Sequence, residues 1–198
     1  MRDYRVITAA ALEGPVTVCR PPTPKPVTLG SDALDVMTDL NRVYAAVIEP
    51  QMNVDAARTY MIQRGVRLLF VLNADKTLAG LVTANDILGE KPMRIVQERG
   101  IHHDEILIAD IQTPLAKLDA LPMSELAHAK VGHVLATLQD TGRQHALAVD
   151  DAAEGKRVCG IFSLSQIARQ LGVSVQTTEV AKSFAEIEAV LAAESSVG

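Results

Sequence analysis

The phrase Gly80-Leu-Val-Thr-Ala-Asn-Asp-Ile places a hydroxyl and a carboxylate where a buried strand leads into a helix. Thr83 stands at the helix start, where backbone N–H groups lack intrahelical partners and favour an anion. Asp86 follows three residues later and therefore projects from the same side of the first turn. A carboxylate can accept hydrogen bonds from both hydroxyls of a ribose. The phrase is thus suited to a nucleoside that carries a phosphate.

The same spacing has a second interpretation. Thr-x-x-Asp is close to a helix capping box, in which the side chains and the backbone of the first turn satisfy one another. The later phrase Ser163-Leu-Ser-Gln166 fits the same box. Gln166 can also hydrogen-bond a ribose, as a neutral and weaker partner than a carboxylate. The spacing alone leaves capping and nucleotide binding open, and the two roles can coexist.

These two phrases close the two copies of an internal repeat. Gly65 pairs with Gly142, and Gly80 pairs with Gly160, so the offset grows from 77 to 80 residues. We place the three additional residues in the second hairpin loop, because loops tolerate insertions. Each copy reads as a helix, a strand, a turn, a strand and a second helix. The expected bounds are 66–72 and 78–83 for the first pair of strands, 131–140 for the second copy's first helix, 144–149 and 158–162 for its strands, and 163–171 for its last helix.

The first helix of the first copy shows the pattern in detail. Asn53 is its expected N-cap, and Gly65 is its expected C-cap. Its apolar residues fall on one stripe that predicts the buried face. The members of this stripe are Val54, Ala57, Met61 and Ile62. Helices on one sheet face and apolar strands on the other predict two small α/β units packed sheet to sheet.

The remaining segments flank or separate these units. Residues 45–50 and 105–109 each predict a strand, and residues 1–19 a short strand or strap. Four prolines in residues 20–26 exclude a helix and favour an extended linker. A final helix is expected to begin at a Thr178 cap. Val180, Phe184, Ile187 and Leu191 share one face of it. This apolar face packs against either the body of the chain or a partner subunit. We divide the chain into a strap and linker (1–30), a first unit (31–92), an insertion (93–109), a second unit (110–172) and a C-terminal amphipathic helix (173–198).

Composition excludes several classes of protein. The chain has 24 acidic and 19 basic residues, 3% aromatic residues and no tryptophan, which disfavours a nucleic-acid-binding surface. No apolar run approaches the roughly 18 residues of a membrane-spanning helix, and no signal peptide is evident. We therefore expect a cytoplasmic protein with no membrane partner. Cys19 and Cys159 are far apart and form no CxxC motif.

Catalytic motifs are missing from the sequence. It holds no GxGxxG, Walker A, HExxH or GxSxG phrase, and its five histidines have no metal-ligand spacing. No serine, histidine or carboxylate spacing nominates a catalytic triad or an acid–base pair. We therefore expect a protein that is not an enzyme and requires neither cofactor nor metal.

The repeat resembles the cystathionine-β-synthase (CBS) domain, here as a tandem pair called a Bateman module. The resemblance spans about residues 31–172. It rests on the unit openings Asp35-VMTDL and Asp110-IQTPL, the middle strands Gly65-VRLLFVLN and Gly142-RQHALAVD, and the closing phrase Gly80-LVTANDI. It implies two β-α-β-β-α units with pseudo-twofold symmetry and two ligand clefts between the sheets. The second unit departs from the family at Gln166 and Ser163, so the resemblance makes the Asp86 cleft the competent one.

The resemblance also implies a function. Its usual ligands are adenosine-containing molecules, namely AMP, ADP, ATP or S-adenosylmethionine, held as regulatory ligands. It implies a homodimer, and a separate protein whose activity is regulated. The alternative is a dimerisation module that binds no nucleotide. The candidate ligand-binding residues are Thr83 and Asp86 with Arg67, Thr38 and Thr113, and, in the second unit, His145, Ser163 and Gln166.

Overall fold

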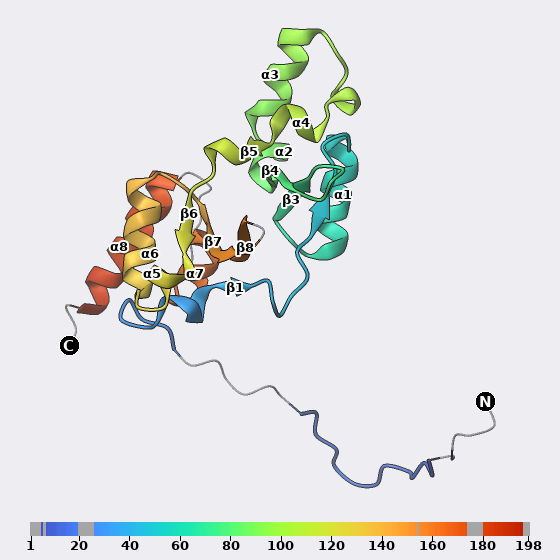
Figure 1. Ribbon diagram of the computed structural model, residues 1–198. Helices are drawn as coiled ribbons and strands as arrows, with labels where there is room; N and C mark the ends of the chain where they lie inside the picture. Colours follow the sequence, from blue (N-terminus) through green and yellow to red (C-terminus); the bar gives the residue numbers. More distant parts are fainter. Residues whose placement is uncertain (1–4, 6, 20–25, 154, 174–179, 196–198) are drawn as a thin grey trace.

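The protein consists of two α/β halves, each built on a four-stranded sheet (Figure 1). The computed structural model describes residues 5, 7–19, 26–153, 155–173 and 180–195. The first sheet has the order β2 (Val47–Ile48), β3 (Leu68–Leu72), β4 (Leu78–Thr83), β5 (Thr113–Pro114). The second has the order β1 (Thr38–Asp39), β8 (Gly155–Ser163), β7 (His145–Ala152), β6 (Ala120–Pro122).

Helices cover the outer faces of both sheets. The α-helices are α1 (Val54–Arg64), α2 (Ala84–Leu88), α3 (Glu90–Arg99), α4 (Ile108–Ile111), α5 (Met123–Leu126), α6 (Val131–Asp140), α7 (Leu164–Gln170) and α8 (Val180–Ser195). The described residues also form the 3-10 turns η1 (Ala33–Val36), η2 (His103–Glu105) and η3 (Leu115–Lys117). Among the described residues, no helix is both long and apolar enough to cross a membrane.

The two repeats exchange their opening strands. β1 pairs antiparallel with β8, and Thr38 lies opposite Ile161. β5 pairs antiparallel with β4, and Thr113 lies opposite Leu81. Each sheet is thus completed by the opening phrase of the other repeat. The segments 31–92 and 110–172 are therefore not self-contained in the fold, although they follow the sequence repeat.

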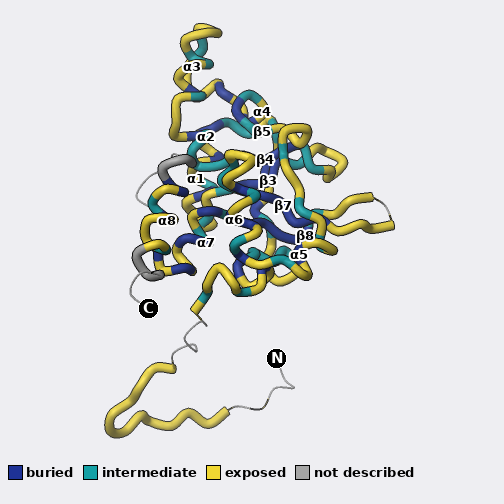
Figure 2. The backbone as a smooth tube through the Cα atoms, turned by 90° about the vertical axis from the view of Figure 1, so that its left-hand side faces the viewer, coloured by how far each residue is buried: buried dark blue, intermediate teal, exposed yellow. Residues whose placement is uncertain are grey.

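Buried side chains form one cluster under the helices of each half and a third cluster between the sheets. Figure 2 shows where the buried residues lie along the backbone. The third cluster joins Phe70 and Leu81 of the first sheet to Leu147, Val149 and Ile161 of the second. This contact confirms the predicted packing of the units sheet to sheet. It also explains why the middle strands are apolar on both faces, since each has helices on one side and the other sheet on the opposite side.

Several elements lie where the sequence predicts them. β4 and α6 have the expected bounds. The Asn53 side chain accepts a hydrogen bond from the Ala56 backbone N–H at 2.8 Å, which caps α1. Gly65 ends the same helix with φ 63°, in the left-handed region that favours glycine. Ile62 departs from the prediction, because its side chain is 71% exposed while the other members of its stripe are buried.

The segment 105–109 is not a strand. It contains the end of η2 and the start of α4, and its β-type pairing within the described chain is limited to one bridge between Leu107 and Asn53. Ile106 and Ile108 are buried in the core of the first half. The alternation of apolar residues in this segment reflects burial in the core and not a strand. The Asp110 carboxylate accepts from the Leu107 backbone N–H at 3.0 Å, which favours the start of a helix there.

The second hairpin differs from the expected one. β7 and β8 stay paired as far as Ala152 and Gly155, with a register shift between Ala148 and Val149, so the additional residues lengthen the strands rather than the loop. Residues 5 and 7–19 form no strand and are exposed. The proline segment at 20–25 and Thr178 lie outside the described residues. Phe184, Ile187 and Leu191 of α8 pack on the core of the second half, so this helix faces the body of its own chain.

Gly80 and Gly160 lie where the exchanged strands pair with the sheets, opposite Pro114 and Asp39. A methyl group on Gly80 would overlap the backbone carbonyl oxygen of Thr113, and one on Gly160 would overlap the flexible side chain of Met37. The two glycines therefore occupy equivalent places in the topology, but Gly80 tolerates an added methyl group less well than Gly160 does.

We predict that Gly80→Ala lowers the free energy of unfolding by about 2 kcal/mol, because the backbone of β5 must shift. Gly160→Ala should cost less, because the Met37 side chain can change rotamer. Urea denaturation of both variants measures the difference. An equal cost for both variants would contradict the view that backbone contact decides it.

Candidate functional site

A cavity of about 580 Å³ lies between the two halves and collects residues from both. The first half contributes Arg67 and Thr83, and the second contributes α7 and the start of β7. Thr38 enters through the exchanged strand β1. Six of the eight predicted site residues line this cavity. They are Thr38, Arg67, Thr83, His145, Ser163 and Gln166.

Polar groups of the second half meet at one side of the cavity. The Thr38 hydroxyl donates to Oε1 of Gln166 at 3.2 Å, because the pairing of β1 with β8 brings Thr38 to the start of α7. The Ser163 and Ser165 hydroxyls share a hydrogen bond of 3.1 Å. Ser163 makes no side-chain capping bond, so the capping box expected at Ser163 and Gln166 is not formed. Gln166 faces Thr38 instead.

Positive charge predominates among the residues that line the cavity. Arg67 and Arg169 line it together with His145, and none of the described lining residues is an aspartate or a glutamate. Two guanidinium groups without a carboxylate favour an anionic ligand group, and arginine binds phosphate or carboxylate bidentately. The sequence patterns did not indicate Arg169, although it lies three residues after Gln166, a spacing that places both on one helix face.

Apolar residues also line the cavity. Leu40, Ala45 and Ala46 line it from the segment after β1, and Ile161 lines it from β8. Asn85 of α2 donates through Nδ2 to Oε1 of Gln144 at 3.2 Å, which ties the two halves together at the cavity. Apolar walls with a few directed polar groups, and a volume within roughly 300–1,000 Å³, are typical of small-molecule sites.

Asp86 and Thr113 do not line this cavity. The Asp86 carboxylate accepts from the Thr83 backbone N–H at 2.8 Å and from the Thr83 hydroxyl at 2.7 Å. Its other oxygen accepts from the ammonium of Lys91, which also donates to the Ile111 carbonyl at 3.2 Å. The capping interpretation of Thr83 and Asp86 therefore describes this phrase, and a role of Asp86 toward a ribose stays a prediction. Lys91 belongs to α3, and no sequence spacing indicated it.

His145 lines the cavity, and its pKa is shifted. Burial lowers the pKa of His145 from 6.5 to about 4; the Asp86 carboxylate acts against this shift, and the Arg67 charge adds to it. The imidazole is therefore neutral at pH 7. Its neutral form can both donate and accept a hydrogen bond toward a ligand.

Thr83 and Ser163 form a matched pair at equivalent positions of the repeat. The Thr83 hydroxyl accepts from the Asp86 backbone N–H at 3.3 Å and caps α2, whereas Ser163 caps nothing with its side chain. We predict that Thr83→Ala lowers the free energy of unfolding by about 1 kcal/mol. Ser163→Ala should change it by less than about 0.5 kcal/mol. Chemical denaturation tests both, and equal losses would contradict the difference in capping.

We predict that His145 weakens the fold in mild acid. The unfolded chain takes up the proton near pH 6.5 and the folded chain only near pH 4, so stability falls as the pH drops through this window. Between pH 7 and pH 5 the loss from this residue is about 2 kcal/mol. His145→Gln should remove that part of the pH dependence. Urea denaturation at both pH values measures it, and an unchanged difference between them would contradict the assignment.

Comparisons with known proteins agree with this architecture. A family model described as the CBS domain matches residues 33–92. A search of curated proteins finds no significant match. An uncharacterised conserved protein from Pyrococcus horikoshii is 24% identical, with 77% of this chain and 100% of that one covered and a TM-score of 0.53.

Two further solved structures are CBS proteins. A CBS-domain-containing protein, ATU1752 from Agrobacterium tumefaciens, is 14% identical, with 72% and 94% covered and a TM-score of 0.52. The CBS domain pair of protein MJ0100 is 19% identical, with 74% and 98% covered and a TM-score of 0.50. The family match lies in the first repeat, and the structural likeness extends over both. Residues 33–92 therefore match the CBS-domain family model, and the chain has the fold of a CBS domain pair.

Proposed function

We propose that this protein is a regulatory module that senses an adenosine-containing ligand in the cavity between its two halves and catalyses no reaction itself. The observation that carries the proposal is the composition of that cavity. It joins an apolar wall, a hydroxyl–amide pair and two arginines, with no carboxylate among the described lining residues. These are the three kinds of surface that a base, a ribose and a phosphate or carboxylate group need.

Each part of the ligand has a place in this scheme. The base lies against Ala45, Ala46 and Ile161, where apolar surface is removed from water. The ribose hydroxyls meet Thr38 and Gln166, which are already joined by a hydrogen bond. The anionic group meets Arg67 and Arg169. The CBS domain pair of MJ0100 was solved in complex with 5′-methylthioadenosine and S-adenosyl-L-methionine, both adenosine-containing, which supports this ligand class.

Regulation follows from where these groups come from. Arg67 belongs to the first half, Gln166 and Arg169 belong to the second, and the Asn85–Gln144 bond crosses between the halves. A ligand that bridges both halves stabilises the arrangement in which all of its contacts are made. Differential affinity of this kind shifts a conformational equilibrium, which a separate protein can then detect.

Thermal unfolding of nucleotide-stripped protein tests the proposal and ranks the ligands. AMP, ADP, ATP and S-adenosylmethionine are compared with ribose 5-phosphate and inorganic phosphate. A ligand at 100 times its dissociation constant adds about 2.7 kcal/mol of stability, or roughly 5–10 °C for a chain of this size. Failure of every adenosine compound to shift the transition would favour a module that binds no nucleotide.

Arg67→Gln should weaken an AMP, ADP or ATP ligand at least about tenfold, since a charge-assisted hydrogen bond contributes about 1.5–3 kcal/mol. The matched control is Arg64→Gln, which removes the same charge from α1 at a residue that contacts the Tyr60 ring and lies outside the cavity. Calorimetry of both variants measures the affinities. Equal affinities in the two variants would show that Arg67 does not contact the ligand.

A further inference from the structure

A second cavity, of about 710 Å³, lies on the helical side of the first half. Met61 and Ile62 of α1 line it together with Ile87 and Leu88 of α2. Ile62 is 71% exposed and Leu88 is 65% exposed, so no described part of the chain covers them. The feature is therefore an apolar groove between two helices, and it includes the residue whose burial the helix pattern predicted wrongly.

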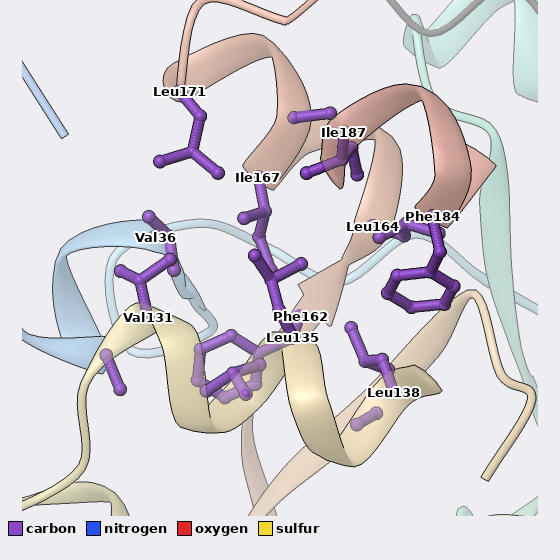
Figure 3. Close-up of a cluster of buried hydrophobic side chains, with 14 of the residues drawn as sticks. Val36, Val131, Leu135, Leu138, Phe162, Leu164, Ile167, Leu171, Phe184 and Ile187 are labelled. Atoms are coloured by element: carbon purple, nitrogen blue, oxygen red, sulfur yellow. The ribbon is translucent and has the colours of Figure 1, made fainter. Parts of the chain in front are cut away.

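The internal repeat identifies the counterpart of this groove. With the offsets of 77 and 80 residues, Met61 corresponds to Leu138, Ile87 to Ile167 and Leu88 to Ala168. These counterparts belong to the core of the second half, where Phe184 and Ile187 of α8 pack with them. Figure 3 shows the Phe184 and Ile187 side chains among those of Leu138, Leu164 and Ile167. The groove on the first half is thus the equivalent of a seat that holds an amphipathic helix on the second.

Charge distinguishes the two seats. Arg58 stands in the groove where the second half has Leu135, and Arg67 stands where it has Gln144. None of the described residues that line the groove is an aspartate or a glutamate. An occupant therefore gains from carboxylates beside its apolar stripe. α8 has this composition, since Glu188 beside the stripe accepts from Gln139 at 2.9 Å.

A second copy of the same groove suits the surface poorly. A twofold contact of groove on groove brings Arg58 and Arg67 of both copies together, without a carboxylate from the described lining residues. Like charges placed across an interface oppose association. An acidic helix meets the same apolar surface without this repulsion.

We infer that the groove formed by Arg58, Met61, Ile62, Arg67, Ile87 and Leu88 is the docking seat for an amphipathic, acidic helix of a partner protein. The helix carries apolar residues at the spacing of Phe184, Ile187 and Leu191, with glutamate or aspartate beside them. This inference does not depend on the proposed ligand, because it rests on a different cavity and on the seat of α8.

The probe is a fluorescein-labelled, capped peptide of residues 180–195, titrated onto the full chain and followed by fluorescence anisotropy. We expect saturable binding that Leu88→Glu and Ile62→Glu each weaken at least tenfold. The matched control is Leu115→Glu, an equivalent change at a half-exposed leucine outside the groove, and it should leave the affinity unchanged. A peptide with Phe184→Ser should bind at least tenfold more weakly, and raised salt should weaken the parent peptide.

Three outcomes overturn the inference. The first is no binding of the parent peptide. The second is binding that Leu88→Glu and Ile62→Glu leave unchanged, because the peptide then displaces α8 from the second half. The third is a dimer in sedimentation velocity that Ile62→Glu dissociates, because a second copy then occupies the groove. Circular dichroism of each variant confirms that it folds, and an unfolded Leu88→Glu is replaced by Arg58→Glu, for which the same loss is expected.

Discussion

The exchange of opening strands is the constraint on which the rest of the structure depends. β1 completes the sheet of the second half and β5 completes that of the first, so neither sheet is complete without the other repeat. This exchange brings Thr38 to within 3.2 Å of Gln166, 128 residues away, and it places the segment after β1 along the wall of the cavity. It also requires glycine at residue 80, where β5 pairs with β4. The strand exchange thus determines both how the sheets are completed and which residues line the cavity.

Local rules predicted local structure well. The Asn53 cap, the end of α1 at Gly65, and the bounds of β4 and α6 all follow from short-range signals. Of the eight site residues predicted from the repeat and its family resemblance, six line one cavity. The failures have a common reason. Ile62 lies on an apolar stripe but is 71% exposed, and Ile106 and Ile108 alternate because the segment that carries them packs in the core of the first half. Lys91 finds Asp86 only through the tertiary fold, and no spacing shows such a contact.

The two closing phrases of the repeat have diverged in charge, and the structure gives this a physical meaning. Asp86 is held by Thr83 and Lys91, so its charge is compensated within the first half. Gln166 lies in the cavity with Arg67 and Arg169, where a carboxylate would compensate the guanidinium charges that attract an anion. A neutral amide leaves those charges uncompensated and still hydrogen-bonds a hydroxyl. The departure from the family pattern thus agrees with an anionic ligand.

The two cavities are joined by residues that line both. Gly65, Val66, Ala84 and Asn85 belong to each of them, and so does Arg67. A ligand phosphate and an acidic residue of a docked helix would both draw on the one guanidinium of Arg67. Linkage requires that any effect of the ligand on helix affinity equals the effect of the helix on ligand affinity. Because a shared cation cannot serve two anions fully, the coupling expected from the two proposals is negative, so that a bound ligand would release a docked helix. Arg67, which lines both cavities, would then connect ligand sensing to helix docking.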